Sequence, residues 1–315
     1  MKTTLALAAL LAAAPAYAQT ASTGAAQPQY DQAQAKKCAA SRSSGYDEGI
    51  AACTALLATK GITPGAVAEV LSYRAGLTYD AAIANPKGSA KRKALMATAD
   101  ADIAAILASA GADKYRRADA YTARAFSRMI DGTGSPDVDL DRALALVPTA
   151  YFALSLRAER REAARNYTGA VADLDAALAT IDRIDPDKIS EDQADSIELK
   201  QAELLNSRCW IKAAWQNADL AAARKDCNAS LDIDPAANTY DSLGMVGLRT
   251  RDWQGAESAY TYAIKAADTY ASPYFGRAIA RMRLGRSTDA NADLARAIQL
   301  DPAVATKYAE KGLKP

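Results

Sequence analysis

Two segments in the last third of the chain repeat each other at a spacing of 34 residues. The recurring positions are small and large apolar residues in the same order. Ala256, Tyr260 and Ala263 return as Ala290, Leu294 and Ala297, and Tyr240, Leu243 and Gly244 return as Tyr274, Arg277 and Ala278. Self-similarity at a fixed period indicates a stack of supersecondary units rather than one closed core. Because such stacks usually present an extended surface to a partner, the period favours a binding protein over an enzyme.

The rest of the sequence favours helices. Alanine, the best helix former, dominates the composition. We find no alternating apolar and polar run of six or more residues, which a half-buried strand would need. The chain is therefore predicted to be all-α.

The positions of the prolines agree with an all-α chain, because they fall at the edges of the expected helices. We expect helix pairs at residues 31–43 with 46–60, 64–84 with 89–110, 114–131 with 136–146, 149–164 with 167–182, 188–216 with 219–232, 237–250 with 253–267, and 271–284 with 287–299. The long segment 188–216 is either one helix or two that meet near Asn206. A capping helix is expected at 303–312.

The repeated motif resembles the tetratricopeptide repeat (TPR). Tyr240-Asp-Ser-Leu243-Gly244 is similar to its W-x-x-L-G opening, and Ala256-x-x-x-Tyr260-x-x-Ala263 to its A-x-x-x-F-x-x-A second helix. The resemblance implies a right-handed α-solenoid of about seven antiparallel helix pairs. It assigns 151–315 to TPR-like repeats, clearest at 237–304, and 31–150 to degenerate helical repeats. Gly247 and Arg281 stand where this family usually has an aromatic residue.

The start of the chain reads as a secretory signal over residues 1–18. Lys2 precedes an apolar stretch too short to span a bilayer, and Ala16-Tyr17-Ala18 fits a signal peptidase site. The alternative is an N-terminal membrane anchor. Residues 19–30 are small and polar and are expected to form a flexible leader. We expect no transmembrane segment after signal removal, and a periplasmic location.

The charge balance argues against a nucleic-acid partner. The chain has 38 Lys and Arg against 37 Asp and Glu, and removing Lys2 leaves 37 of each. Proteins dedicated to nucleic acids usually carry a strong basic excess. The expected partner is therefore another protein or a peptide.

The four cysteines fall into two pairs that are symmetric about predicted turns. Cys38 and Cys53 are equally far from the turn at Ser44-Gly45, and Cys209 and Cys227 from a turn near Ala218. Residues equidistant from the turn of a helix hairpin lie opposite each other, within reach of a disulfide. In an oxidising compartment this predicts the bonds Cys38–Cys53 and Cys209–Cys227. Buried free thiols are the alternative, and neither pair has redox-active C-x-x-C spacing.

The sequence offers little for catalysis. It contains no histidine, which excludes Ser-His-Asp and Cys-His chemistry. Carboxylates such as Asp173 with Asp175 are expected to lie solvated on helix surfaces. The loop from Asp131 to Asp137 lacks the lysine of a P-loop and the ligands of an EF-hand, and is expected to be a turn. We therefore expect no catalytic residue, no metal site and no cofactor.

A binding groove is implied by the resemblance, because the first helices of such repeats line a concave face. The corresponding positions here are Asn238, Asp241, Met245, Leu248, Arg249, Ser272, Phe275, Ile279, Met282 and Arg283. Apolar side chains mixed with arginines suit a peptide that carries a carboxylate, which arginine can bind bidentately. These positions do not hold the combined set of lysines and asparagines that defines the family's carboxylate-clamp type. We therefore do not assign that specificity to this chain. The alternative is that these arginines form a solvated face and the apolar residues pack between units.

These observations predict a non-enzymatic periplasmic scaffold that binds a protein or peptide on the concave face of a helical array. Two other hypotheses remain: that the chain is an accessory subunit of an envelope enzyme, and that it is a structural protein that associates with itself. No compact segment longer than about 30 residues lies outside the expected helix pairs, which disfavours an embedded enzyme domain.

Overall fold

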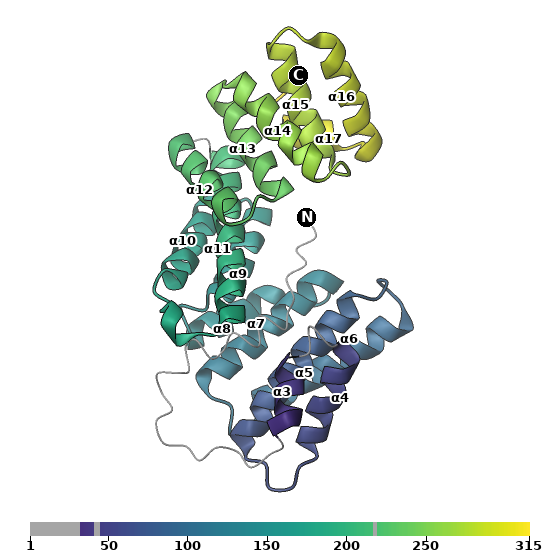
Figure 1. The fold of residues 1–315 in the computed structure, drawn as a ribbon, viewed down its shortest axis with the longest axis vertical. Coiled ribbons are helices and arrows are strands. Elements are labelled where there is room, and N and C mark those ends of the chain that lie inside the picture. The colour runs from purple at the N-terminus through teal and green to yellow at the C-terminus, as the bar shows by residue number, and fades with distance from the viewer. Residues whose placement is uncertain (1–31, 41–44, 217–218) are drawn as a thin grey trace. The chain divides into compact units, whose positions relative to one another are not determined.

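The computed structural model describes residues 32–40, 45–216 and 219–315 (Figure 1). The predicted signal at 1–18 and leader at 19–30 lie outside these residues. Within the described ranges the chain forms fifteen α-helices, one 3₁₀ turn and one π-helix, and no strand. The prediction of an all-α chain built of helix pairs is confirmed.

The helices follow one another as seven pairs and a final short helix. They are α3 (Gln32–Ala40) with α4 (Tyr46–Leu57), α5 (Pro64–Ile83) with α6 (Ala90–Ala108), α7 (Lys114–Asp131) with α8 (Pro136–Leu146), α9 (Tyr151–Ala163) with α10 (Tyr167–Ile181), α11 (Glu191–Ile211) with α12 (Leu220–Ile233), α13 (Ala237–Thr250) with α14 (Trp253–Ala266), α15 (Ala271–Arg283) with α16 (Ser287–Leu300), and α17 (Val304–Ala309). Local signals set many of these ends. Thr63, Ser89 and Asp113, for example, each accept a backbone N–H at the start of their helices.

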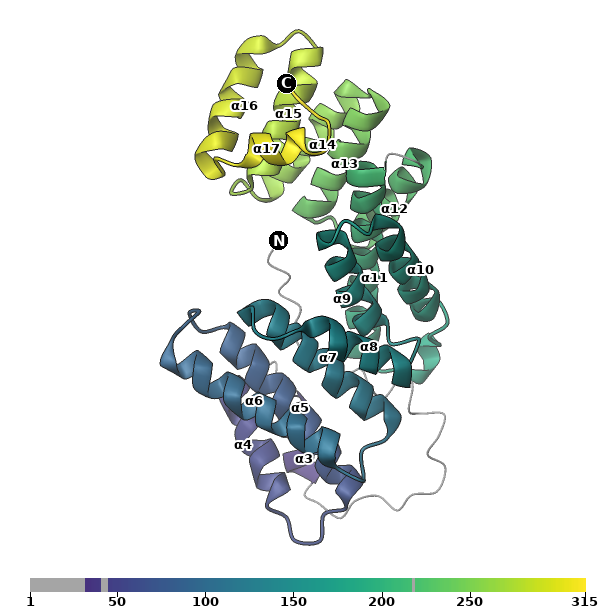
Figure 2. The same cartoon turned by 180° about the vertical axis from the view of Figure 1, so that it is seen from behind.

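The chain divides into two compact units, each described here by itself. The first comprises 1–157 with 182–193, and the second 158–181 with 194–315. In the first unit each helix from α3 to α8 packs on the next, as Figure 2 shows for α5 and α6. Its terminal hairpin has a small core in which Cys38, Cys53 and Leu56 of α3 and α4 meet Val70 and Leu77 of α5.

The second unit is built around α13, which contacts α12, α14, α15 and the π-helix η2 (Lys212–Gln216). Its core includes Met245 and Val246 of α13, Tyr260 of α14, and Phe275 and Ile279 of α15. All five side chains are at most 3% exposed. This core holds the first helices of successive pairs against one another.

Small residues at the repeat positions allow the helices of the second unit to approach closely. A Cβ atom at Gly244 would lie 2.6 Å from the Tyr260 ring, and one at Gly276 only 2.2 Å from it. A Cβ at Gly247 would lie 2.9 Å from the backbone of Ala256, which explains why no aromatic residue stands there. The glycines thus form a slot for Tyr260 between α13 and α15.

A buried carboxylate recurs on the second helix of many pairs, where it faces arginines of the first helix. The contacts are Asp102 with Arg74, Asp139 with Arg124 and Arg128, Asp173 with Arg161, Asp226 with Arg208 and Lys212, and Asp293 with Arg277 and Arg281. The expectation that Asp173 is solvated was wrong: it is 3% exposed. Sequence spacing alone could not reveal this, because each partner lies on a different helix.

The long segment does not break near Asn206. Helix α11 runs without interruption to Ile211 and then continues as the π-helix η2. Asn206 is buried inside the helix, and its side-chain oxygen accepts a hydrogen bond from Ser242 at 2.7 Å. The buried contact with α13 keeps this polar residue within the helix.

Candidate functional site

The residues expected to line a groove lie on α13 and α15, the first helices of the two clearest repeats. We call the surface that these two helices share the first-helix face. Four of its apolar members, Met245, Leu248, Phe275 and Ile279, are at most 3% exposed. Asp241, Arg249, Ser272 and Met282 are half-buried, and Asn238 and Arg283 are exposed. Most of this face is therefore covered in the folded chain.

The cover is the chain's own C-terminal segment, residues 304–315, which comprises α17 and the residues after it. Tyr308 packs against Phe275 with ring centroids 4.8 Å apart, and its hydroxyl donates to the carbonyl of Ser272 at 3.0 Å. Val304 and Tyr308 are buried, and Leu313 packs at the edge of the same core. The first-helix face thus holds a short helix.

Arg249 binds main-chain carbonyls and is therefore not available for the carboxylate of a partner. Its Nε donates to the carbonyl of Ala213 at 2.9 Å, and its Nη2 to those of Ala214 at 2.8 Å and Lys311 at 2.6 Å. Burial lowers the pKa of Arg249 from its ordinary value. The guanidinium therefore caps carbonyls of the π-helix η2 and holds the C-terminal segment at the same time.

Asp241 is the acidic member of the first-helix face. It accepts hydrogen bonds from the hydroxyl of Ser272 at 3.0 and 2.9 Å to its two oxygens. Burial raises the pKa of Asp241 to about 7, while the Ser272 hydrogen bond and the charge of Lys311 act to lower it. Asp241, Ser272 and Tyr308 form one polar chain between α13, α15 and α17.

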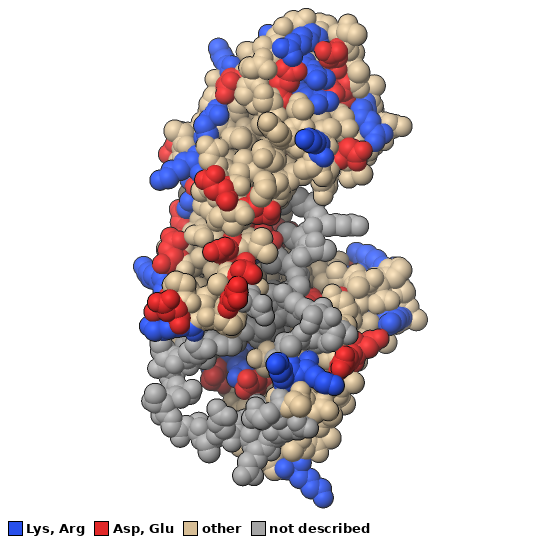
Figure 3. Space-filling view, in the orientation of Figure 1, with Lys and Arg blue, Asp and Glu red and all other residues tan. Residues whose placement is uncertain are grey.

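The arginines on and just after α15 have different roles. Arg277 and Arg281 pair with Asp293, and Arg281 and Arg286 pair with Glu257. Arg283 is exposed, and its Nη2 donates to the carbonyl of Lys314 at 3.4 Å. In Figure 3 blue and red side chains accordingly lie side by side over the C-terminal repeats.

Sequence reasoning missed an aromatic site beside the first-helix face. Trp210, in the last turn of α11, and Trp215, in η2, both donate their indole N–H to one oxygen of Glu162, at 3.0 and 3.1 Å. Tyr167 stacks on Trp215 with centroids 5.1 Å apart. The ammonium of Lys311 lies 4.3 Å from the Trp215 ring centre and 5.6 Å from that of Trp210. The only sequence signal was the pair of tryptophans spaced by five residues.

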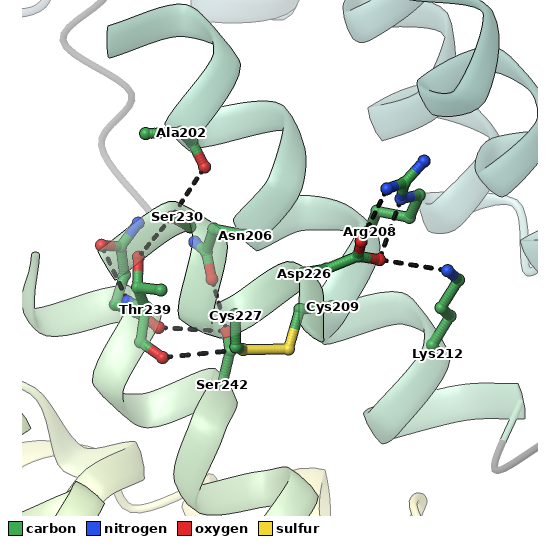
Figure 4. Close-up of a disulfide and its surroundings, with 11 residues drawn as sticks. Ala202, Asn206, Arg208, Cys209, Lys212, Asp226, Cys227, Ser230, Thr239 and Ser242 are labelled. Carbon is green, nitrogen blue, oxygen red and sulfur yellow. Dashed lines mark hydrogen bonds and ion pairs between the residues drawn. A yellow bond between two sulfur atoms is a disulfide. The ribbon is translucent and has the colours of Figure 1, made fainter. Parts of the chain in front are cut away.

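Each predicted cysteine pair lies at disulfide distance. The sulfur atoms are 2.08 Å apart for Cys38 and Cys53 and 2.02 Å apart for Cys209 and Cys227. The second pair joins α11 to α12, next to the buried bonds from Ser230 to Ala202 and from Ser242 to Asn206 (Figure 4). On its other side Arg208 and Lys212 both bind Asp226. This hairpin supports the end of α11, where the aromatic site begins.

In the part of the chain that the structure describes, no three His, Cys, Asp or Glu side chains gather closely enough to hold a metal ion. No helix in the same residues has the length and apolar composition needed to cross a membrane.

The spacing of helix starts decides the type of repeat. Helices α13 and α15 begin at Ala237 and Ala271, and α14 and α16 begin at Trp253 and Ser287, so both spacings equal the 34-residue period. The motif positions Ala256, Ala278 and Ala290 are fully buried between helices. These helix pairs have the helix spacing of the tetratricopeptide motif that the sequence resembles, and they bury its small residues between helices.

Comparisons with known proteins report the following similarities. No family model matches the sequence. Over 77 residues the chain is 38% identical to the protein SGT1 homolog of Oryza sativa subsp. japonica, a match that covers 24% of this chain and 21% of that protein. The chain thus spans about a fifth of the length of that relative.

Among solved structures, the chain is similar to three chains at low identity. MamA has 15% identity and a TM-score of 0.42, covering 58% of this chain and 96% of its own. YrrB, titled a TPR protein with an unusual peptide-binding site, has 13% identity and a TM-score of 0.43, covering 62% and 91%. Yeast Tom70 has 13% identity and a TM-score of 0.44, covering 96% and 68%.

Proposed function

We propose that this protein is a non-enzymatic scaffold that binds a peptide segment of another protein on the first-helix face of its TPR repeats. The observation that carries the proposal is the C-terminal segment itself. It occupies this face through a buried tyrosine against Phe275 and through main-chain carbonyls that accept from Arg249 and Arg283. Recognition of a helix by apolar anchors in a groove is a recurrent mode of peptide binding.

The contacts suit a replaceable ligand. Hydrogen bonds to the carbonyls of Lys311 and Lys314 depend on the main chain, so another sequence can satisfy them. Specificity would then come from the side chains at Val304, Tyr308 and Lys311, which meet the core and the aromatic site. A partner segment of similar shape would compete with the chain's own residues for the same surface.

The proposed compartment is the periplasm. Two cysteine pairs at disulfide distance support an oxidising environment, since such bonds are rare where thiols are kept reduced. The signal-like residues 1–18 of the sequence point the same way. Measurement of the processed N-terminus by mass spectrometry of the protein isolated from its native cells would test this location.

A synthetic peptide provides the direct test of the binding face. A fluorescent peptide with the sequence of residues 301–315 is titrated into the full chain and into its Tyr308→Ala variant. We expect saturable binding that is tighter for the variant, because its own segment has lost the anchor against Phe275 and competes less well. Circular dichroism verifies that the variant keeps its helix content.

The matched control is the same peptide with alanine at the tyrosine position, which should bind at least tenfold more weakly, since a buried aromatic anchor contributes more than 1.4 kcal/mol. Absence of saturable binding to both chains would refute the proposed face. Equal binding of both peptides would remove Tyr308 as the anchor and would also contradict the proposal.

A further inference from the structure

The aromatic site around Lys311 has the composition of a receptor for a cation. Two indole rings lie within 6 Å of one ammonium, at 4.3 and 5.6 Å. A cation over the face of a tryptophan is attracted by the ring quadrupole, and tryptophan is the best ring for this purpose. A carboxylate, Glu162, lies behind both rings and accepts their N–H groups. Its negative charge acts to keep Lys311 protonated, against the effect of burial, which lowers the pKa of Lys311.

The π-helix explains how two tryptophans five residues apart serve one lysine. In an α-helix with 3.6 residues per turn, side chains five positions apart point about 140° away from each other. The wider i→i+5 turn of η2 brings such positions into line. Arg249 caps the carbonyls of Ala213 and Ala214 in this turn, so a side chain of the first-helix face maintains the aromatic site.

The present occupant is held by few contacts. Helix α17 has six residues, far fewer than an isolated helix needs to be stable in water. Of its residues only Val304 and Tyr308 are buried, while Ala305, Thr306, Lys307 and Ala309 are exposed. The ammonium of Lys311 donates a hydrogen bond to the carbonyl of Lys307 within the same segment. Elements with so little buried surface open locally at low free energy.

We propose that Trp210, Trp215 and Glu162 form a specificity site for a lysine of the bound partner, and that Lys311 is its occupant within the chain. The inference rests on the proposed function of the first-helix face and adds the chemistry of the ligand. The partner segment is a short helix with a tyrosine or similar aromatic residue followed three positions later by a lysine. The aromatic residue occupies the place of Tyr308 against Phe275, and the lysine occupies the aromatic site.

The test compares peptides that differ in one side chain. The receptor is the full chain with Lys311→Ala, which empties the aromatic site and keeps Val304 and Tyr308. Three peptides of residues 301–315 are titrated into it, with the natural sequence, with norleucine in place of Lys311, and with norleucine in place of Lys307. Lys307 is the matched control, because it lies in the same segment and its ammonium pairs with Asp301 rather than with the aromatic site.

We expect the natural and the Lys307-substituted peptides to bind alike, and the Lys311-substituted peptide to bind about tenfold more weakly. The difference should vanish when the receptor also carries Trp215→Leu. Equal binding of all three peptides would overturn the proposed specificity while leaving the proposed binding face intact. A preference that survives Trp215→Leu would overturn the assignment to this site.

A second arm uses the chain without added peptide, so it decides the question even if no peptide binds. Hydrogen exchange of the α17 amides is measured in Lys311→Met, Lys311→Arg and Lys307→Met. We expect faster exchange, by about tenfold, in Lys311→Met alone, with rescue by the cationic arginine. Equal protection in Lys311→Met and Lys311→Arg would show that the site does not recognise the charge.

Discussion

The α13–α14 and α15–α16 pairs share one register, yet matched residues serve different purposes. Arg249 and Arg283 stand 34 residues apart at the ends of their first helices. Arg249 is half-buried and donates to three carbonyls, whereas Arg283 is exposed and reaches one carbonyl at 3.4 Å. The repeat therefore sets the position of a side chain on its helix, and the neighbouring elements decide what that side chain binds. Helix α13 has the π-helix η2 beside it.

The same contrast appears at two further matched positions. Gly244 accommodates the ring of Tyr260, whereas the corresponding positions of the next pair hold Ala278 and the smaller Leu294. Asp241 corresponds to Phe275, so a polar chain on α13 meets an apolar anchor on α15. Each pair thus contributes a different half of the first-helix face. Substitutions at the matched positions can test each of these differences.

Removing the support of α13 is expected to have the largest effect. The double substitution Cys209→Ala with Cys227→Ala opens the loop that closes α11 and α12 and should lower the free energy of unfolding by about 3 kcal/mol. Urea unfolding measures the loss. Cys38→Ala with Cys53→Ala is the matched control, with a loop of similar length in the α3–α4 hairpin of the first unit.

Both bonds are also checked directly by alkylation of the unreduced, unfolded protein followed by intact mass measurement. Labelling of any cysteine in that experiment would contradict the predicted bonds. We expect the tryptophan emission to change in the Cys209 and Cys227 variant alone, because α11 leads into the aromatic site.

The two matched arginines are expected to differ next. Arg249→Ala leaves carbonyls of Ala213 and Ala214 without their donor and should cost about 2–3 kcal/mol of stability, since bonds from a charged donor are among the stronger ones. Arg283→Ala should change stability by less than about 0.5 kcal/mol, as is usual at exposed positions. Thermal unfolding of both variants provides the comparison, and equal losses would remove the distinction drawn between the two pairs.

The glycine slot should give a smaller effect that a second change partly restores. Gly244→Ala places a methyl group within 2.6 Å of the Tyr260 ring and is expected to cost about 1–2 kcal/mol by overpacking. Tyr260→Leu is expected to destabilise by removing buried ring surface. The double variant, which copies the Ala278 and Leu294 combination of the next pair, should be more stable than the sum of the two single losses. Simple additivity in urea unfolding would argue against this slot.

Asp241 should make the smallest contribution, and one that depends on pH. Its folded pKa of about 7 lies above the ordinary value near 3.9, so the folded state binds an extra proton between these pH values. Stability contributed by that proton is present below about pH 4 and is lost as the pH rises through 7. Asp241→Asn should therefore be more stable than the natural chain at pH 8.5, by about 1 kcal/mol after screening at this half-buried site, and equal to it at pH 4. A constant difference across this range would count against the assignment.

Much of the fold could be predicted because its signals are local. The ends of α7, α8 and α13 match the expected positions to the residue. Prolines, caps and apolar periodicity act within one or two turns, so they remain legible in a chain without further information. The cysteine partners were predictable for a related reason, since a hairpin turn fixes which residues lie opposite each other.

The candidate site was predictable only in part. Sequence register placed Met245, Phe275 and Ile279 on one face, and the structure puts them in one core. The C-terminal helix was expected, but its position over this face was not. Arg249 bonds to a carbonyl 62 residues away, and Trp215 contacts a carboxylate 53 residues earlier. No local pattern encodes contacts at such separations.

The sequence by itself determined a stack of helix pairs, their register and the pairing of cysteines, because these follow from periodicity, turn chemistry and chain symmetry. Only the tertiary structure decided which arginines bind carbonyls and which bind buried carboxylates. It also decided that the ammonium of Lys311 lies close to the rings of two tryptophans. The physical reason is that charged and aromatic side chains act over a few ångströms. Their partners therefore depend on how helices that are distant in the sequence pack together. The 34-residue repeat specifies the helices but not these contacts.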